Sequence, residues 1–295
     1  MSAEALASEW LSADFGYSIR VRRTLLDLQT PYQHLQVLDT PQFGHVLRLD
    51  GALQCSEADE FFYHEPLVHV PAMLHPSPRS ALVIGGGDGG AAEELLKHPS
   101  IAHVHLVEID CEVIEASRRF LQTVNRGLFD TLPAGAGRFT WEIGDGLDYL
   151  QHGQQQFDLI VLDLTDPGAV SSPLYHEDFY RLCASRLAPG GWLSLHVAAP
   201  WLQQQRAASI VQRLRQAFRV VNPFVTNVPL SGGPWLMACC AQYEVEADPA
   251  RIRERCQLLQ GPTLRYYSAS VHAACMTLPP YLEDLLAPDG APGPA

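Results

Sequence analysis

The chain has 295 residues, of which 47% are hydrophobic and 18% are charged. This balance excludes an intrinsically disordered chain and predicts one or two globular domains. The formal net charge of −13 argues against a nucleic-acid partner, because such proteins carry a basic surface. An acidic protein would instead attract a cationic small molecule.

The seven cysteines are odd in number, and most of them lie in apolar runs. We therefore expect reduced, buried thiols in a cytoplasmic protein rather than a disulfide framework. Neither a Cys-x-x-Cys pair nor a zinc-type histidine spacing occurs, so no metal site is expected. The first twelve residues lack the basic segment of a signal peptide. No apolar run reaches the ~18 residues of a membrane span.

The first part of the chain predicts a small antiparallel β domain. Residues 16–55 alternate apolar and polar side chains in short runs between turn signals. A helix is expected over 56–74, followed by a short Pro-rich joint at 75–79. We place the domain boundary at this joint, with an N-terminal β domain over 1–75 and a second domain over 76–295.

The second domain alternates strands with helices, which predicts βαβ units and a doubly wound, mostly parallel α/β sheet. Strands are expected at 81–85, 103–108, 139–143, 157–162, 192–197, 220–225 and 235–241, and helices at 91–98, 111–121, 176–187 and 201–218. The segment after Pro279 is rich in Pro and Gly, so we expect it to be loosely ordered.

A glycine-rich loop, Gly85–Gly90, joins the first of these strands to a helix. Its G-x-G-x-x-G pattern lets the backbone turn sharply and lets a ligand approach closely. Glu108 ends the next strand, 18 residues after Gly90, where a carboxylate can accept hydrogen bonds from both ribose hydroxyls. The loop, its strand–helix setting and this acid together predict a nucleoside site.

Asp88, inside this loop, indicates which nucleoside would bind. A carboxylate beside a helix N-terminus would repel a pyrophosphate and favour a cationic nucleoside. A sulfonium such as S-adenosylmethionine, or its decarboxylated form, therefore fits better than NAD. The alternative is that Asp88 only caps the helix at Gly89.

Gly144-Asp145-Gly146 follows the strand expected at 139–143. An acid at a strand end can accept from an adenine amino group, although the same letters also fit a plain turn. Because Glu108 and Asp145 end successive predicted strands, the two acids together favour an adenosine ligand.

Several motifs together resemble the polyamine aminopropyltransferases, the family typified by spermidine synthase. They follow the family's order along nearly the whole chain: Tyr32-Gln33, Leu49-Asp50-Gly51, Asp59–Glu65, Gly85–Gly90, Val107–Asp110, Gly144–Gly146, Asp163–Pro167, Leu264–Tyr267 and Val271–Ala274. The resemblance implies a small β domain on a doubly wound, Rossmann-like domain of the methyltransferase type, assembled as a homodimer or homotetramer. It also implies transfer of an aminopropyl group from decarboxylated S-adenosylmethionine, as co-substrate, to an amine such as putrescine. Methylthioadenosine would be released, and no further cofactor would be needed.

The resemblance also implies roles for residues on the donor side. Gln33 would contact the nucleoside, Asp88 would hold the propylamine nitrogen, and Glu108 would bind the ribose. Asp145, followed by Gly146, would bind the adenine.

On the acceptor side, the resemblance makes Asp163 the general base and Asp166 the residue that binds the acceptor amine. Tyr63 and His64 would line the channel near the transferred group. The residues alone leave other interpretations open. Tyr63 also fits a core aromatic, His64 a structural histidine, and the two acids a helix-capping turn. His196 could either face the cleft or pack in the core.

Three departures from the family pattern fall on the acceptor side. The usual Asp-Pro-x-Gly-Pro-Ala segment reads Asp-Pro-Gly-Ala-Val-Ser-Ser-Pro over 166–173, which changes the loop at 167–173. A glutamate expected to meet the far amine of putrescine is Ala198, and an acceptor-lining tyrosine is replaced at Val228. Because an unpartnered charge in a pocket costs binding energy, we expect putrescine to be a poor acceptor or another amine to be preferred.

Three functions are consistent with these residues. Aminopropyl transfer is favoured by Asp88, which suits an ammonium group and disfavours the added carboxylate of intact S-adenosylmethionine. The second candidate is an amine N-methyltransferase that uses S-adenosylmethionine. The third is a noncatalytic polyamine- or nucleoside-binding protein, against which the retained Asp163 and Asp166 argue.

Overall fold

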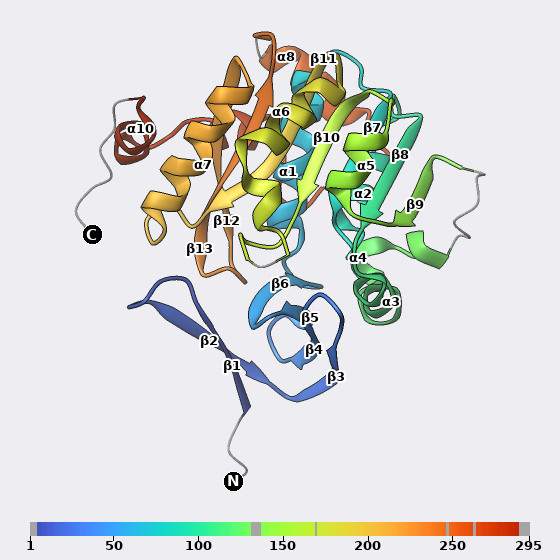
Figure 1. Ribbon diagram of the computed structural model, residues 1–295, viewed down its shortest axis with the longest axis vertical. Coiled ribbons are helices and arrows are strands. Elements are labelled where there is room, and N and C mark those ends of the chain that lie inside the picture. Colours follow the sequence, from blue (N-terminus) through green and yellow to red (C-terminus); the bar gives the residue numbers. More distant parts are fainter. Residues whose placement is uncertain (1–4, 131–136, 169, 246–247, 262–263, 289–295) are drawn as a thin grey trace.

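The computed structural model describes residues 5–130, 137–168, 170–245, 248–261 and 264–288. Over these residues, a large sheet covered by helices stands above a smaller β unit (Figure 1). Among the described helices, none combines the length and the hydropathy that crossing a membrane requires.

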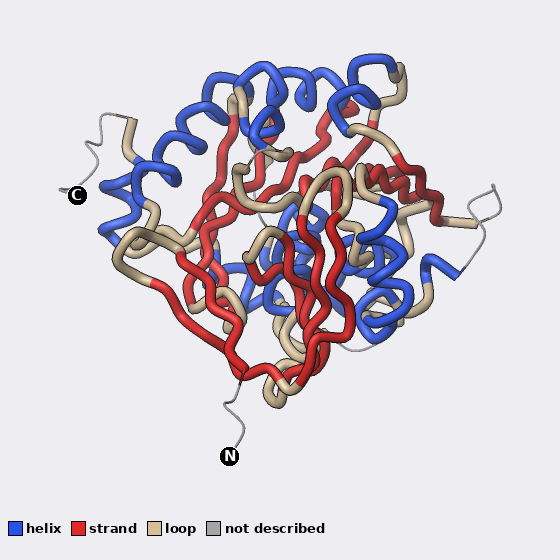
Figure 2. Tube along the Cα trace, turned by 60° about the horizontal axis from the view of Figure 1, so that its bottom comes forward, coloured by secondary structure: helices blue, strands red, loops and turns tan. Residues whose placement is uncertain are grey.

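The small unit consists of an antiparallel hairpin and an antiparallel sheet, as the sequence predicts. The hairpin pairs β1 (Ala5–Trp10) with β2 (Gly16–Val21), and the sheet runs in the order β3 (Arg23–Gln29), β4 (His34–Thr40), β5 (Gly44–Leu49) and β6 (Ala52–Ser56). Figure 2 shows these strands at the front of the molecule. The sequence did not predict β1 as a separate strand, because Leu6 and Trp10 are exposed and break the usual burial pattern.

Helix α1 (Phe61–Leu74) lies on the large sheet and is buried along almost its whole length. It begins five residues later than expected, because Ser56 ends β6 and residues 57–60 form a turn, which the Ser56 hydroxyl closes by donating to Asp59 Oδ1 at 2.5 Å. The division into two domains stays a proposal. The packing of α1 favours a boundary before this helix rather than at residue 75.

The large sheet is mixed, with seven strands among the described residues, in the order β12-β13-β11-β10-β7-β8-β9. The strands are β7 (Ser80–Gly85), β8 (His103–Glu108), β9 (Phe139–Ile143), β10 (Phe157–Asp163), β11 (Leu187–Ala198), β12 (Val220–Val228) and β13 (Gly233–Ala241). The five strands from β11 to β9 pair in parallel, and only the pairs that include β13 are antiparallel. The predicted doubly wound α/β domain is therefore confirmed.

Helices cover both faces of this sheet. Along β7, Ala81 and Val83 enter one core, while Leu82 and Ile84 enter the other, as the two-residue period of a strand requires. The first core also packs under α1, α2 (Gly90–Leu96), α8 (Pro249–Gln257) and α9 (Ala269–Cys275), and the second under α5 (Gly146–His152), α6 (Glu177–Arg186), α7 (Gln204–Ala217) and α10 (Pro280–Leu286). Helices α3 (Cys111–Phe120) and α4 (Gln122–Asn125) follow β8.

The prediction that the chain after Pro279 is loosely ordered is wrong for residues 280–288. Helix α10 begins with Pro280 in its first turn, where proline is tolerated, and it packs against α7. Its three leucines, Leu282, Leu285 and Leu286, are buried. The apolar spacing of these leucines outweighs the nearby prolines, and residues 289–295 lie outside the described part.

Candidate active site

A cleft with about 1350 Å³ of empty space lies at the carboxyl ends of the parallel strands. Strand β7 sits between β8 and β10, so the chain leaves the sheet in opposite directions on its two sides. Open α/β sheets bind ligands at such a point. Strands β5 and β6 of the small unit form the opposite wall, through Leu47, Leu49 and Leu53.

The glycine-rich loop is tied directly to the end of β10. The Gly86 N–H donates to the Asp163 carbonyl oxygen at 2.8 Å. Gly85 has φ +78°, and a Cβ there would lie 2.3 Å from the same oxygen, so only glycine fits. The close approach brings Asp88, in the loop, and Asp163 to the same cleft.

Glu108, at the end of β8, lines the cleft beside the loop. Its oxygens accept hydrogen bonds from the Gly87 N–H at 3.2 Å and the Asp110 N–H at 2.9 Å. Burial raises the pKa of Glu108 to about 7, and these N–H groups oppose the shift. Gln33 also lines the cleft, and its amide donates to Asp110 Oδ2 at 3.0 Å, which links the small unit to the large one.

Asp145 and Gly146 line the same cleft as Glu108. Asp145 caps α5, because its Oδ1 accepts from the Leu147 N–H at 2.7 Å. Gly146 is required sterically, since a Cβ there would lie 2.2 Å from a methyl carbon of Ile84. Asp145 therefore caps a helix rather than forming a plain turn, and it lines the cleft as well, while its contact with adenine stays a prediction.

His64 lies behind Asp88 and does not itself line the cleft. It is 2% exposed, and its ring packs on Gly90, where a Cβ would lie 2.3 Å from the ring. Its Nδ1 lies 3.0 Å from Glu60 Oε2, and its Nε2 lies 3.5 Å from Asp88 Oδ1. Burial alone would lower the pKa of His64, but these carboxylates, Asp88 foremost, raise it well above its usual range.

Asp88 is correspondingly held in its charged form. Burial opposes this, yet His64 lowers the pKa of Asp88 below its usual value. Its Oδ1 also accepts from the Gly90 N–H at 2.7 Å. The capping interpretation is therefore partly correct, but Asp88 also lines the cleft, where a cationic group of a ligand can reach it.

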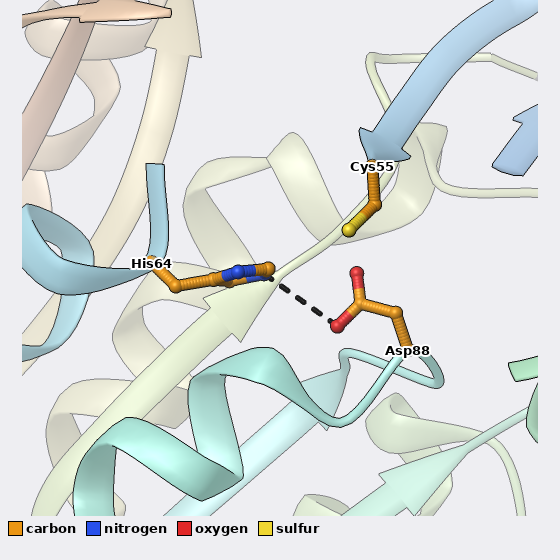
Figure 3. Close-up of side chains that lie close together, drawn as sticks. All are labelled: Cys55, His64 and Asp88. Atoms are coloured by element: carbon orange, nitrogen blue, oxygen red, sulfur yellow. Dashed lines mark ion pairs between the residues drawn. The ribbon is translucent and has the colours of Figure 1, made fainter. Parts of the chain in front are cut away.

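Cys55, His64 and Asp88 point toward one another, and their ligand atoms lie within 4.8 Å (Figure 3). This spacing would admit a metal ion, but the chemistry of the donors opposes one. Burial and the charge of Asp88 raise the pKa of the Cys55 thiol well above its usual range, whereas a metal binds the thiolate. The protonated His64 offers no lone pair. We interpret the group as a charge-paired cluster that fixes Asp88.

Asp163 lies at the end of β10, in the middle of the cleft. Its Oδ2 is buried without a hydrogen-bond partner among the described residues, and it lies 3.7 Å from His64 Nε2. Burial, followed by the charge of Asp88, raises the pKa of Asp163 to about 6. A carboxyl group with these properties can accept a proton near neutral pH.

His196, at the end of β11, lines the cleft and forms a hydrogen-bonded chain with two tyrosines. The Tyr175 hydroxyl donates to the Thr165 carbonyl at 2.9 Å, so it must accept from His196 Nε2 at 3.0 Å. The other ring nitrogen, Nδ1, then accepts from the Tyr63 hydroxyl at 2.9 Å. Tyr63 lines the cleft as well, so both residues are more than core packing.

Asp166 lies in the loop after β10 and already has a cationic partner. Arg206, from α7, donates to its Oδ2 at 2.6 Å, while its Oδ1 lies 3.4 Å from His196 Nε2. Burial would raise the pKa of Asp166, but His196 and Arg206 lower it. Ser171 closes the loop by donating to the Asp166 carbonyl oxygen at 2.7 Å.

Glu9 of β1 also lines the cleft, and sequence reasoning missed it. Its Oε2 accepts from the Tyr17 hydroxyl at 2.8 Å and from the Leu53 N–H at 2.9 Å. Burial raises the pKa of Glu9. By contrast, Ala198 and Val228 are buried and do not line the cleft.

The charges that line the cleft are almost all negative. Its lining contains six carboxyl groups and, over the described residues, neither lysine nor arginine: Glu9, Asp88, Glu108, Asp145, Asp163 and Asp166. Such a cleft favours cationic ligands and disfavours anionic ones.

Comparisons with known proteins agree with this geometry. Residues 60–249 match the family model described as the spermine/spermidine synthase domain, and residues 8–57 match the spermidine synthase tetramerisation domain. A polyamine aminopropyltransferase of Nitrosomonas europaea is 42% identical over 295 residues, covering 98% of this chain and 88% of the relative. One from Moorella thermoacetica is 36% identical over 282 residues and covers 95% of both chains.

Among solved structures, a spermidine synthase in complex with the transition-state analogue AdoDATO superposes with a TM-score of 0.87. Its sequence is 30% identical, and the match covers 96% of this chain and 95% of that one. The chain belongs to the spermine/spermidine synthase family of aminopropyltransferases.

Proposed function

We propose that the protein transfers the aminopropyl group of decarboxylated S-adenosylmethionine to an amine acceptor and releases methylthioadenosine. The observation that carries this proposal is the row of six carboxyl groups along a cleft without lysine or arginine among its described lining residues. A sulfonium, a propylammonium and a polyamine are all cations, so each gains from such a field. The relatives are named for aminopropyl transfer, which does not favour the N-methyltransferase alternative.

Donor binding would use the half of the cleft around the glycine-rich loop. Glu108, with its carboxylate at the end of β8, would accept hydrogen bonds from the ribose hydroxyls, and Gln33 would lie beside the nucleoside. Asp145 and Gly146 would meet the adenine. Asp88, positioned by His64, would hold the ammonium of the propylamine group. Intact S-adenosylmethionine carries an additional carboxylate on this side chain, and Asp88 would repel it.

The reaction would be a displacement at the methylene next to the sulfonium. The acceptor nitrogen donates its lone pair to form the new C–N bond, while the C–S bond breaks and its electrons return to sulfur. The leaving group is activated by its own positive charge, so the protein mainly aligns the reactants and accepts a proton.

Asp163 would accept the proton that the acceptor amine must lose. A free alkylamine resembles lysine, with a pKa of about 10.4, and arrives mostly protonated. Burial raises the pKa of Asp163 to about 6, which narrows the difference in basicity. Tyr63 and His196 would line the path of the amine, and Asp166 would contact the amine that stays charged.

Two departures from the family pattern bear on the acceptor. Ala198 and Val228 stand where the family resemblance leads us to expect a glutamate and a tyrosine, and both are buried apolar residues that do not line the cleft. We therefore propose that putrescine is used less well than in relatives with those residues, or that a different amine is preferred.

We further propose that the protein is cytoplasmic and acts as a homodimer or homotetramer. All seven cysteines are free thiols, which suits a reducing compartment. Leu6 and Trp10 of the N-terminal hairpin are 61% and 70% exposed, and residues 8–57 match a family domain described by its role in tetramerisation. Exposed apolar side chains of this kind suit contact between copies.

Product analysis tests the proposed reaction. The protein is incubated with decarboxylated S-adenosylmethionine and, in separate assays, putrescine, cadaverine, diaminopropane, spermidine and agmatine. We expect methylthioadenosine and one aminopropylated amine in equal amounts. Formation of S-adenosylhomocysteine from S-adenosylmethionine, or no nucleoside product with any amine, would contradict the proposal. A large advantage for putrescine would contradict only the inference about the acceptor.

A further inference from the structure

We propose that Arg206 sets the acceptor specificity of the cleft by competing with the acceptor's charged amine for Asp166. The inference rests on the proposed function and concerns a residue outside every motif described above. It makes Arg206 a negative determinant of diamine binding.

The Asp166 carboxylate is already engaged before an acceptor arrives. Arg206 Nη1 lies 2.6 Å from its Oδ2, and His196 Nε2 lies 3.4 Å from its Oδ1. The side chains of Arg206 and Asp166 are 34% and 30% exposed, so the ion pair is partly solvated. A pair of this kind is weak enough for a competing cation to replace.

Arg206 also lines a shallow depression that is open to solvent, together with Ser172, His176 and Arg213. The guanidinium can therefore move away from Asp166. Displacement breaks the ion pair with Asp166, and the acceptor bears this cost.

A diamine needs Asp166 more than a monoamine does. One nitrogen loses its proton to Asp163 and attacks, while the other stays cationic and requires a carboxylate. Glu9 is another acid that lines the cleft, and its Oε2 already accepts from the Tyr17 hydroxyl and the Leu53 N–H. By occupying Asp166, Arg206 would penalise acceptors with a second positive charge and leave monoamines unaffected.

The test compares Arg206→Gln with Arg213→Gln. Arg213 lies on the same helix and is partly buried like Arg206, but it donates to the Tyr175 carbonyl at 3.0 Å instead of to a carboxylate. We expect Arg206→Gln to lower the KM for putrescine about fivefold, the scale of one partly exposed ion pair. We expect no change in kcat or in the Kd for methylthioadenosine. The KM of butylamine, or its inhibition constant if it is not a substrate, should also stay the same. Arg213→Gln should resemble the wild type.

Three further variants serve as controls. Arg206→Met should reproduce the effect if the glutamine variant folds poorly, and Arg206→Lys should retain the wild-type KM because it keeps the charge. In an Asp166→Asn background, Arg206→Gln should no longer lower the KM. An unchanged or higher KM in Arg206→Gln, or an equal fall in Arg213→Gln, overturns the proposal. A wild-type protein that forms no methylthioadenosine overturns the proposed function and this inference with it.

Discussion

The two halves of the cleft are built differently. The donor half, where we propose that the nucleoside binds, is made from adjacent strand ends and the loop Gly85–Gly90, whose backbone is hydrogen-bonded to Asp163. The acceptor half joins side chains from distant parts of the chain, such as Glu9, His196 and Arg206. The donor half is thus specified by short motifs, while the acceptor half depends on how separate elements pack. Changes of substrate should therefore come from the acceptor half.

Asp163 stands where the two halves meet, and its replacement should have the largest effect. We expect Asp163→Asn to lower kcat by about 10²-fold or more, because the acceptor amine loses its proton acceptor. The Kd for methylthioadenosine, measured by calorimetry, should stay within about twofold of the wild-type value, which also shows that the variant is folded. A kcat close to that of the wild type would remove Asp163 from its proposed role.

Glu108 tests the donor half alone. Glu108→Gln should weaken methylthioadenosine binding by about tenfold, since the ribose hydroxyls would lose a charged acceptor. The kcat at saturating donor and the KM for the amine should change little. Asp158→Asn, which also alters an acid of the large sheet but away from the cleft, serves as the control. An unchanged Kd in Glu108→Gln would contradict the ribose assignment.

The pH dependence should separate the two halves as well. Burial raises the pKa of Glu108 to about 7, and the proposed ribose contact uses its ionised form. Methylthioadenosine binding should therefore weaken as the pH falls through 7, by about tenfold between pH 8 and pH 6. Glu108→Gln should abolish this dependence, and its persistence in that variant would refute the assignment.

For the transfer step, burial and the charge of Asp88 raise the pKa of Asp163 to about 6. In the proposed mechanism the deprotonated form of Asp163 is the base, so kcat should fall as the pH drops below about 6 and should level off above it. Stopped assays at saturating donor and acceptor over pH 5–9 measure this limb. A kcat that is constant down to pH 5 would contradict a base at Asp163.

The smallest expected effect concerns the rigidity of the donor half. A Cβ at Gly90 would lie 2.3 Å from the His64 ring, so Gly90→Ala should lower the free energy of unfolding by about 1–3 kcal/mol. Gly144→Ala is the matched control, because its Cβ would meet Val107 at an ordinary 3.6 Å. Equal stabilities of the two variants in urea unfolding would show that His64 is not held by close packing on Gly90.

The sequence predicts most of the donor half because its signals are local. Glu108 ends a strand that the apolar pattern defines, and Gly85–Gly90 lies between a predicted strand and a predicted helix. The helix α10 was missed because prolines beside it outweigh three leucines in a local pattern. Strand β1 is not predicted for a similar reason. Its apolar residues Leu6 and Trp10 are exposed, so they do not follow the alternation of buried and exposed side chains that marks a strand.

The acceptor half was predicted less completely, because its contacts span long sequence separations. Glu9 reaches the cleft through a bond to the Leu53 N–H, 44 residues away, and Arg206 meets Asp166 over 40 residues. His196 pairs with Tyr63 across 133 residues, so the sequence could not decide between packing and the cleft. Packing of α1 and α7 on the large sheet brings Tyr63, His196, Arg206 and Asp166 together, and the small β unit adds Glu9.

The central claim is that the cleft recognises a cationic sulfonium nucleoside whose propylamine carries no carboxylate. Calorimetric titration with decarboxylated S-adenosylmethionine and with S-adenosylmethionine tests it most directly. The row of acids around Asp88 predicts binding of the decarboxylated form at least about tenfold tighter, since the extra carboxylate would face like charge. Equal affinities, or tighter binding of S-adenosylmethionine, would contradict the account.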